Sequence, residues 1–290
     1  MCLFVGLSRA GFYRYLRAQD PWDEEMGVRS EIQRIALEHQ RRYGYRRMTA
    51  ELRRRGMLVN HKRVARLMSA DSLIGTKLES PSVSTDTQMH GKIYLNLANR
   101  MKLTGMNQLW VADITFVRLK REFVYLAVVL DRFSRKVVGW NLDRTLTARL
   151  PLAALEKALK ERKPEPGLVH HSDRGAQYAH AAYLRTLHKH GVVPSVSRPG
   201  SPSDNANCES FFRTLKWEEV YAKEYKDLED LRLNITAFND CYYNRIRLHS
   251  ALGYRPPEEF EQVTVSSSAA SISSASKLDL VKRETLFPVE

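Results

Sequence analysis

Residues 109–131, LWVADITFVRLKREFVYLAVVLD, decide the fold of the larger part of the chain. The stretch 109–119 alternates and is rich in β-branched and aromatic side chains, KRE at 120–122 can turn, and 123–131 is continuously apolar. Alternation is typical of a strand with one open face, and a continuous apolar run is typical of a strand buried in a sheet. The pattern therefore predicts a β-hairpin whose second strand is buried.

Downstream of this hairpin, strand patterns and helix patterns alternate. Strand patterns occur at 136–142, 167–173 and 192–197, and helix patterns occur at 147–162, 181–191 and 207–220. Three meandering strands followed by alternating helices and strands predict an α/β domain with a mixed sheet. We place this domain at residues 106–262, and we expect the Ser/Ala-rich residues 263–290 to be disordered.

The N-terminal residues 1–75 have the pattern of a small helical region. Met48 and Leu52 lie on one predicted helix that Gly56 ends, and Asn60 can cap a second one. Two short helices joined by a turn are typical of a helix-turn-helix. Residues 76–105 show no strong periodicity, and we expect a linker there.

The second of these helices would bury Val64 and present Lys62, Arg63 and Arg66 to DNA. Between residues 29 and 66 the chain has twelve Lys and Arg against three acids. A small helical domain with a solvated basic face is the alternative.

The overall charge favours a polyanionic partner. The 290 residues include 46 Lys and Arg against 33 Asp and Glu, a formal net charge of +13. Nucleic acid is the default partner for such a chain, and an anionic membrane surface is the alternative. No apolar run reaches the roughly 18–20 residues that a membrane span needs, so no membrane-spanning segment is expected. The three cysteines are scattered without a C-x-x-C pair, which fits a reducing compartment and argues against a paired-cysteine zinc site.

Three acids stand at positions where chemistry is expected. Asp113 lies within the first predicted strand, Asp173 at the end of the fourth, and Glu209 on the following helix. Acids are rare in buried strands unless they are paired or bind metal. Converging carboxylates repel one another unless a cation lies between them, and hard divalent cations prefer such oxygens. Two ions so held can clamp the attacking and leaving oxygens of a phosphoryl transfer.

Other polar residues near these acids have simpler explanations. Asp131 is expected to cap a turn, and Asp204 or Asn205 is expected to cap the helix that carries Glu209. His170 and His171 alternate along a strand and therefore face opposite sides, so one is expected to be a core or hydrogen-bonded residue.

Several words around the acids resemble a known family. WVADITFV, LAVVLDRFSRKVVGW, HHSDRGAQY, SVSRPGSPSDNANCESFFRTLKWE and YYNRIRLHSALGYRPPEEF occur in this order, and 35 residues separate Asp173 from Glu209. They resemble the OrfB-type transposases of bacterial insertion sequences, whose core belongs to the DDE class of the retroviral-integrase superfamily. YGYRRMTAELRRRGMLVNHKRVARLM resembles the helix-turn-helix segment that precedes that core. The resemblance runs from about Leu7 to Phe260.

This resemblance implies an RNase H-like core with Asp113, Asp173 and Glu209 as its catalytic, metal-binding triad. It implies Mg²⁺ or Mn²⁺, two ions in number, and DNA cleavage at element ends followed by attack of the 3′-hydroxyl on target DNA. The implied partners are the terminal inverted repeats, target DNA, further copies of the chain on DNA, and the product of the upstream reading frame. The implied location is the bacterial cytoplasm, at the nucleoid.

Glu209, Arg213 and Lys216 share one helix face, because they are spaced at i, i+4 and i+7. In the resembled family a cation seven residues after the glutamate contacts DNA, which assigns that role to Lys216. Arg213 is either a DNA contact or an ion-pair partner of Glu209. The segment 242–260, with Arg245 and Arg247, either contacts DNA or packs on the core.

Two other function classes compete with a transposase. A DNA-binding regulator would use the helix-turn-helix alone, and the intact set of three acids argues against it. An RNase H-like nuclease acting on another nucleic acid would share the triad, and the words around the triad argue against it.

Overall fold

The computed structural model describes residues 22–73, 95–120, 122–198 and 202–267, and the chain divides into two compact units, Met1–Ser82 and Val83–Glu290. Most of the expected linker and residues 268–290 lie outside the described residues. Among the described residues, no helix is long and apolar enough to cross a membrane.

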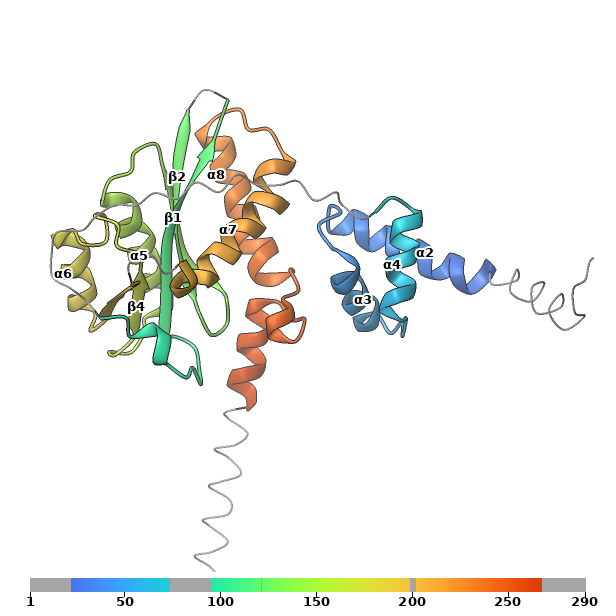
Figure 1. Ribbon diagram of the computed structural model, residues 1–290, viewed down its shortest axis with the longest axis horizontal. Helices are drawn as coiled ribbons and strands as arrows, with labels where there is room; N and C mark the ends of the chain where they lie inside the picture. The colour runs from blue at the N-terminus through green and yellow to red at the C-terminus, as the bar shows by residue number, and fades with distance from the viewer. Residues whose placement is uncertain (1–21, 74–94, 121, 199–201, 268–290) are drawn as a thin grey trace, which may run out of the picture. The chain divides into compact units, whose positions relative to one another are not determined.

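The first unit contains three helices, α2 (Trp22–Glu38), α3 (Tyr45–Arg54) and α4 (His61–Ala70) (Figure 1). The Asn60 side chain accepts a hydrogen bond from the backbone N–H of Lys62 at 2.9 Å, so the predicted cap of α4 is confirmed. The predicted Met48, Leu52 and Val64 are buried. Other apolar side chains of the three helices are buried with them, namely Ile32, Ile35, Leu67 and Met68. Three short helices thus share one apolar centre.

Some of the arginines of this unit form ion pairs with glutamates of the same unit. Arg55 contacts Glu51 on its own helix and Glu31 and Glu38 on α2, with N–O distances of 2.5–3.1 Å. Its guanidinium therefore links the first two helices. Arg66, one of the three predicted DNA contacts, pairs with Glu25 at 2.7 Å.

The second unit is built on a five-stranded mixed sheet in the order β3-β2-β1-β4-β5. Its strands are β1 (Leu109–Arg118), β2 (Phe123–Asp131), β3 (Val137–Asp143), β4 (Val169–Ser172) and β5 (Val193–Val196). The first three pair antiparallel, whereas β4 pairs parallel with both β1 and β5. All five predicted strands are present, and the predicted mixed α/β fold is confirmed.

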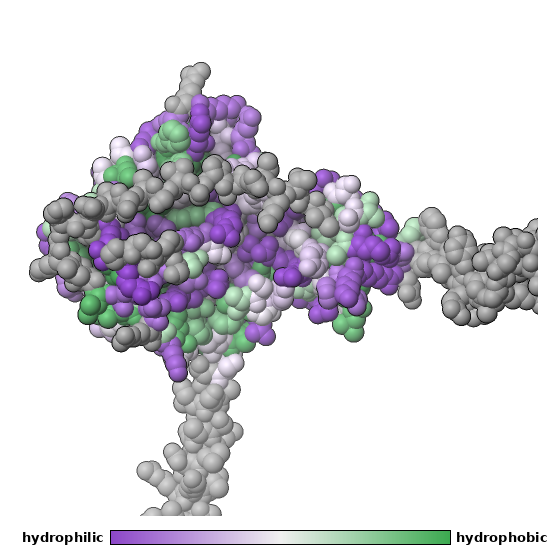
Figure 2. Space-filling model, in the orientation of Figure 1, coloured by the Kyte–Doolittle hydropathy of each residue, from purple (hydrophilic) through white to green (hydrophobic). Residues whose placement is uncertain are grey.

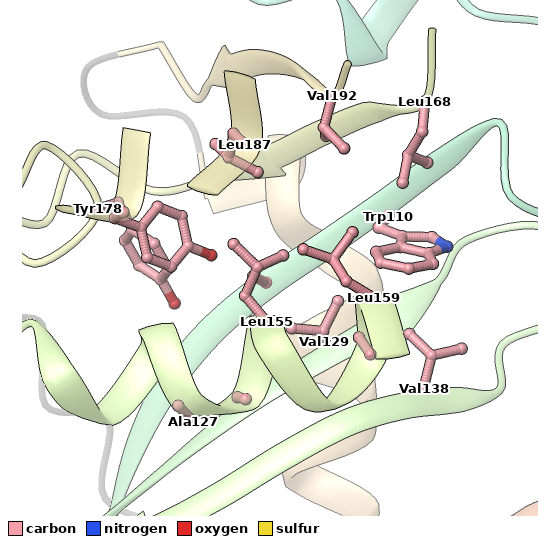
Figure 3. Packing of buried hydrophobic residues seen from close by; sticks show 14 of the residues in the cluster. Trp110, Ala127, Val129, Val138, Leu155, Leu159, Leu168, Tyr178, Leu187 and Val192 are labelled. Atoms are coloured by element: carbon pink, nitrogen blue, oxygen red, sulfur yellow. The ribbon is translucent and has the colours of Figure 1, made fainter. Parts of the chain in front are cut away.

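Helices cover both faces of this sheet (Figure 1). One face packs against α5 (Arg149–Arg162) and α6 (Ala181–Lys189), and Figure 3 shows Leu155 and Leu159 of α5 directed at Val129 and Trp110 of the sheet. On the other side lie α7 (Ala206–Glu218) and α8 (Leu228–Thr236), followed by a π-helical turn over Ala237–Tyr243. Parallel strands of this kind need cover on both faces because their side chains are apolar on both.

Two expected boundaries differ in the structure. Residues 95–105, assigned to the linker, already belong to the second unit: Asn96 Nδ2 donates to Asp204 Oδ2 at 2.7 Å, and the Leu97 N–H donates to Ser195 Oγ at 3.0 Å. These polar contacts fix a segment whose apolar pattern is weak.

Residues 263–267, assigned to the expected tail, are helical. A helix covers 257–267, and Glu261 on it accepts two hydrogen bonds from Arg162, both at 2.8 Å. Pro257 stands at its first position, where the missing N–H costs nothing. A bidentate ion pair to α5 anchors this helix, which composition alone does not reveal.

Gly139 on β3 permits the closest approach between the sheet and α5. A Cβ at this position would lie 2.2 Å from the Ala154 carbonyl oxygen and 2.8 Å from the Ala158 Cβ. Backbone atoms cannot yield as a flexible side chain can, so Gly139→Ala must push α5 away from the sheet. We expect a loss of about 1–3 kcal/mol in the free energy of unfolding, measured by urea denaturation.

Gly105→Ala is the matched control, because the nearest atom to its added Cβ is Gln108 Nε2 at 3.8 Å. It should change stability by less than about 0.5 kcal/mol. Equal stability of the two variants would contradict the close packing of β3 on α5.

Candidate active site

Strand register brings the first two acids to the same level of the sheet. β1 and β4 are parallel, with Trp110 opposite His170 and Val111 opposite His171. The same register continued by two residues sets Asp113 level with Asp173, immediately after the end of β4 at Ser172. The two carboxylates therefore lie on neighbouring strands at the edge where β4 stops.

Backbone N–H groups orient both carboxylates. The Ile114 N–H donates to Asp113 Oδ1 at 2.8 Å, and the Gly175 N–H donates to Asp173 Oδ1 at 2.9 Å. A Cβ on Gly175 would lie 3.0 Å from that same Asp173 oxygen, so a larger residue would crowd the carboxylate. Gly175 thus serves a tight turn around the acid.

The third acid arrives on α7, whose start is fastened to β1. Asn205, which precedes the helix, donates from Nδ2 to the carbonyl oxygen of Ala112 at 3.2 Å. Glu209 lies exposed in the first turn of the helix, and its neighbour Cys208 is buried. Burial raises the pKa of the Cys208 thiol, and the charges of Asp113, Asp173 and Glu209 raise it further. All three carboxylates therefore lie near enough to this one buried thiol to affect its pKa.

Burial and like charge both act on Asp113. Burial is the larger cause, and together with the neighbouring charges of Asp173 and Glu209 it raises the pKa of Asp113 to about 7. The Ile114 N–H and Lys216 act in the opposite direction. The Asp173 side chain reaches solvent, yet the protein around it desolvates it enough to raise its pKa as well. Without a counter-cation, this arrangement opposes full ionisation.

The chemistry of this donor set suits a hard divalent cation. Three carboxylates offer only oxygen ligands, which Mg²⁺ and Mn²⁺ prefer. Within the residues that the structure describes, no three His, Cys, Asp or Glu side chains already surround a single point that could hold a metal ion. The carboxylates therefore converge on one region but do not form a closed set of ligands.

The two histidines of the fourth strand are structural. His170 Nε2 lies 3.0 Å from the Tyr183 hydroxyl, and His171 lies between the hydroxyls of Ser195 and Ser197 at 2.9 and 3.0 Å. Burial lowers the pKa of both to about 4, so both are neutral at physiological pH. They bond to opposite sides of the sheet, as alternation predicts.

Of the two residues predicted to cap α7, Asn205 occupies the cap position and Asp204 does not. Asp204 instead accepts hydrogen bonds from Arg198 and Asn96, and the charged Arg198 is the principal cause that lowers its pKa to about 2. Asn205 stands at the cap position without a capping bond from its side chain. Arg198 binds the Asp204 side chain, and the Ala112 carbonyl oxygen accepts a hydrogen bond from the Asn205 side chain. These contacts direct both side chains away from the N–H groups of the first turn of α7. Asp131, by contrast, accepts bonds from the N–H groups of Phe133 and Ser134, as a turn cap should.

Lys216 extends from α7 towards β1. Its Nζ lies 5.0 Å from the centre of the Phe116 ring, and it acts electrostatically on Asp113. Burial lowers the pKa of Lys216, and Asp113 opposes that change. Arg213, one turn earlier, is exposed and makes no ion pair with Glu209, so the ion-pair alternative is wrong.

The structure also decides the role of the 242–260 segment. Arg247 is buried and forms a bidentate ion pair with Glu218 at the end of α7, with distances of 2.7 and 2.8 Å. Arg245 is exposed and pairs with Glu258 at 3.2 Å. Arg247 therefore packs against the helix that carries Glu209. Its separation from Glu218 by 29 positions leaves no local pattern that would have revealed the pair.

Residues 104–202 and 190–257 match families described as an integrase core domain, and residues 21–77 match an HTH-like domain. Among solved structures, the catalytic core of HTLV-2 integrase in complex with magnesium aligns with 55% of this chain and 99% of its own, at 13% identity and a TM-score of 0.43.

Relatives of the whole chain are transposases. The chain is 35% identical over 232 residues to the transposase for insertion sequence element IS904 of Lactococcus lactis, covering 80% of this chain and 92% of that protein. It is 34% identical over 267 residues to transposase InsF for insertion sequence IS3A of Escherichia coli, covering 90% of this chain and 92% of that protein. The chain therefore belongs to the insertion-sequence transposases that combine an HTH-like domain with an integrase core.

Proposed function

We propose that Asp113, Asp173 and Glu209 are the catalytic carboxylates with which this transposase cleaves DNA at element ends and joins the 3′-hydroxyl to target DNA. The observation that carries the proposal is the convergence of the three acids where β4 ends, with Asp113 held inside the central strand. Desolvation and two like-charged neighbours disfavour the charge of the half-buried Asp113 carboxylate, and binding a metal ion would offset that cost.

The three carboxylates are suited to hold Mg²⁺ or Mn²⁺, and we propose two ions. Such ions, when bound, activate the attacking oxygen and neutralise charge on the leaving oxygen. Asp113 and Asp173 contribute carboxylates already oriented by the Ile114 and Gly175 N–H groups. Glu209 approaches from α7, and Lys216, seven residues along the same helix, is placed to meet a DNA phosphate near the acids.

Recognition of the element ends is proposed for the helical unit. Lys62 is exposed and Arg63 is half-buried, and neither has a carboxylate partner among the described residues. Arg66 is a weaker candidate, because a contact with DNA would compete with its ion pair to Glu25. Arg213 on α7 remains a candidate phosphate contact in the catalytic unit.

The proposed partners are the terminal inverted repeats, target DNA, further copies of this chain on DNA, and the product of the upstream reading frame. The proposed location is the bacterial cytoplasm, at the nucleoid. A regulator that only binds DNA would have no use for three converging acids.

Replacing any of the three acids by its amide should remove the chemistry but not DNA binding. Asp113→Asn, Asp173→Asn and Glu209→Gln should each lower metal-dependent strand transfer by on the order of a thousandfold or more, because the acids act as a unit. The assay is joining of a labelled element end to plasmid DNA in Mg²⁺, Mn²⁺ or Ca²⁺. Ca²⁺ should support binding alone.

Glu229→Gln is the matched control for Glu209→Gln. It also lies in the first turn of a helix, is exposed, and pairs only loosely with Arg232 at 3.7 Å. It should keep full activity. Full activity of Glu209→Gln, or of the wild type in excess chelator, would refute the site assignment.

Asp113 should make the metal-free protein less stable as the pH rises. Its pKa of about 7 in the folded state exceeds the ordinary aspartate pKa of 3.8, so the folded state holds more protons between about pH 4 and pH 7. Stability is then lost across that window as the pH increases. Asp113→Asn should be more stable than the wild type at pH 8 by about 1–4 kcal/mol, and the two should converge near pH 4.

The measurement is urea denaturation at a series of pH values in chelator. Added Mg²⁺ should stabilise the wild type at pH 8 and have a smaller effect on Asp113→Asn. If the free energy of unfolding of Asp113→Asn depended on pH as that of the wild type does, Asp113 would not be the group whose raised pKa causes the loss of stability.

Lys62 and Arg63 should contribute to the salt dependence of DNA binding. Removing two phosphate contacts by Lys62→Gln with Arg63→Gln should reduce the slope of log affinity against log salt by about 1.8, since each contact contributes about 0.9. The control is Lys160→Gln with Lys189→Gln, which removes the same charge from exposed positions on α5 and α6. Identical slopes for the two variants would show that Lys62 and Arg63 on α4 face solvent and do not contact DNA phosphates.

A further inference from the structure

We propose that Phe116 and Phe123, flanked by Lys216 and Arg118, form a stacking site for an unpaired DNA base beside the catalytic carboxylates. The inference rests on the proposed function, to which it adds a specific feature of the DNA substrate. It concerns the end of the β1–β2 hairpin that extends past β4 (Figure 1).

This part of the hairpin has one open edge. β4 ends at Ser172, whereas β1 continues to Arg118 and pairs there with β2. Phe116 lies three residues beyond Asp113 on that stretch, roughly 10 Å along the strand. Alternation turns these two side chains to opposite faces of β1, but the strand edge is open beyond β4, and Lys216 of α7 already reaches the Phe116 ring there. A nucleotide adjacent to one held at the acids could follow the same path around this edge to the ring.

The two phenylalanine rings are exposed and close together. Phe116 is 41% exposed and Phe123 is 50% exposed, and their ring centres are 5.8 Å apart at an angle of 75°. The register, with Phe116 opposite Tyr125 and Arg118 opposite Phe123, puts both rings on one face of the hairpin. An edge-to-face pair leaves aromatic surface open to a third ring. Hydrophobic surface next to hydrophilic atoms is visible at this end of the molecule (Figure 2).

A cation lies over each ring. Lys216 Nζ is 5.0 Å from the Phe116 ring centre, and Arg118 Cζ is 5.7 Å from the Phe123 ring centre. Among the described residues neither cation forms an ion pair.

Other cations near this end do find carboxylates. Lys120 pairs with Glu224, and Arg144 pairs with Glu122, both at 2.8 Å. The two cations that contact the rings are therefore available to an external anion.

This combination suits a single-stranded nucleotide better than a duplex. Aromatic rings stack on any base, and adjacent cations pair with its phosphates. Bases inside a duplex hide their faces, whereas an unpaired base next to a cleaved end exposes them. A simple cross-strand packing pair would explain the two rings, but it gives no reason for two unpaired cations over them.

The test uses the full-length protein in chelator, so that no DNA is cut. The probes are a duplex with a short thymidine overhang that contains 2-aminopurine, and a blunt duplex of the same sequence. The wild type should quench the 2-aminopurine fluorescence and bind the overhang at least about fivefold more tightly than the blunt duplex.

Phe116→Leu with Phe123→Leu should abolish both the quenching and the preference, because leucine packs on the hairpin but cannot stack. Phe116→Tyr with Phe123→Tyr should keep both. The single variant Phe123→Leu, at the more exposed ring, should lose part of each and serves if the double leucine variant does not fold.

Quenching and preference unchanged in the leucine variants would overturn the inference. So would a change in sedimentation with DNA discrimination unchanged, which would assign the rings to contact with a second copy of the chain. A comparison of strand transfer by the wild type and by Glu209→Gln tests the proposed catalytic site independently of the stacking site. If Glu209→Gln is inactive and the leucine variants still discriminate overhangs, only the stacking site is wrong.

Discussion

The arrangement of the catalytic unit depends on a carboxylate placed inside the central strand of a sheet. Asp113 is hydrogen-bonded by one backbone N–H and faces two further acids. Both acids disfavour the negative charge of Asp113, and burial disfavours that charge more than either acid does. Such a residue can be held in place only by a scaffold that is rigid on both sides.

The scaffold provides that rigidity through contacts far apart in the sequence. β1 pairs with β2 from Trp110 to Arg118 and with β4 from Leu109 to Val111, two residues before Asp113. Asn205 ties the start of α7 to β1, and the buried pair of Arg247 with Glu218 ties its end to the C-terminal segment. Removing one partner of a buried ion pair leaves an uncompensated charge, so these links are specific as well as strong.

Charge in this protein has two different uses. The helical unit is rich in arginine, yet Arg55 and Arg66 are engaged by glutamates of the same unit. A run of basic residues therefore overstates the surface available to DNA. Lys62 and Arg63, and in the catalytic unit Lys216 and Arg118, are among the cations for which the described residues offer no ion-pair partner.

The sequence by itself determined the five strands and the cap of α4, and it singled out three acids as candidates for the site. Alternation and apolar runs report which faces are buried, and these patterns are local, which explains why the five strands and the Asn60 cap were predictable. The acids stood out because a charged residue in an apolar strand is costly without a purpose.

Only the tertiary structure decided which polar groups meet. Asp204 or Asn205 was expected to cap α7, but Arg198 and Asn96 bind Asp204, and Asn205 donates to the Ala112 carbonyl oxygen. Arg247 turned out to be a packing residue. The helix over 257–267 extends into residues that composition marked as disordered, because Arg162 anchors it through Glu261. These outcomes depend on competition between hydrogen-bond partners distant in the chain. Local sequence determines which kinds of partner a side chain can bind, and the fold determines which of them lies within hydrogen-bond distance.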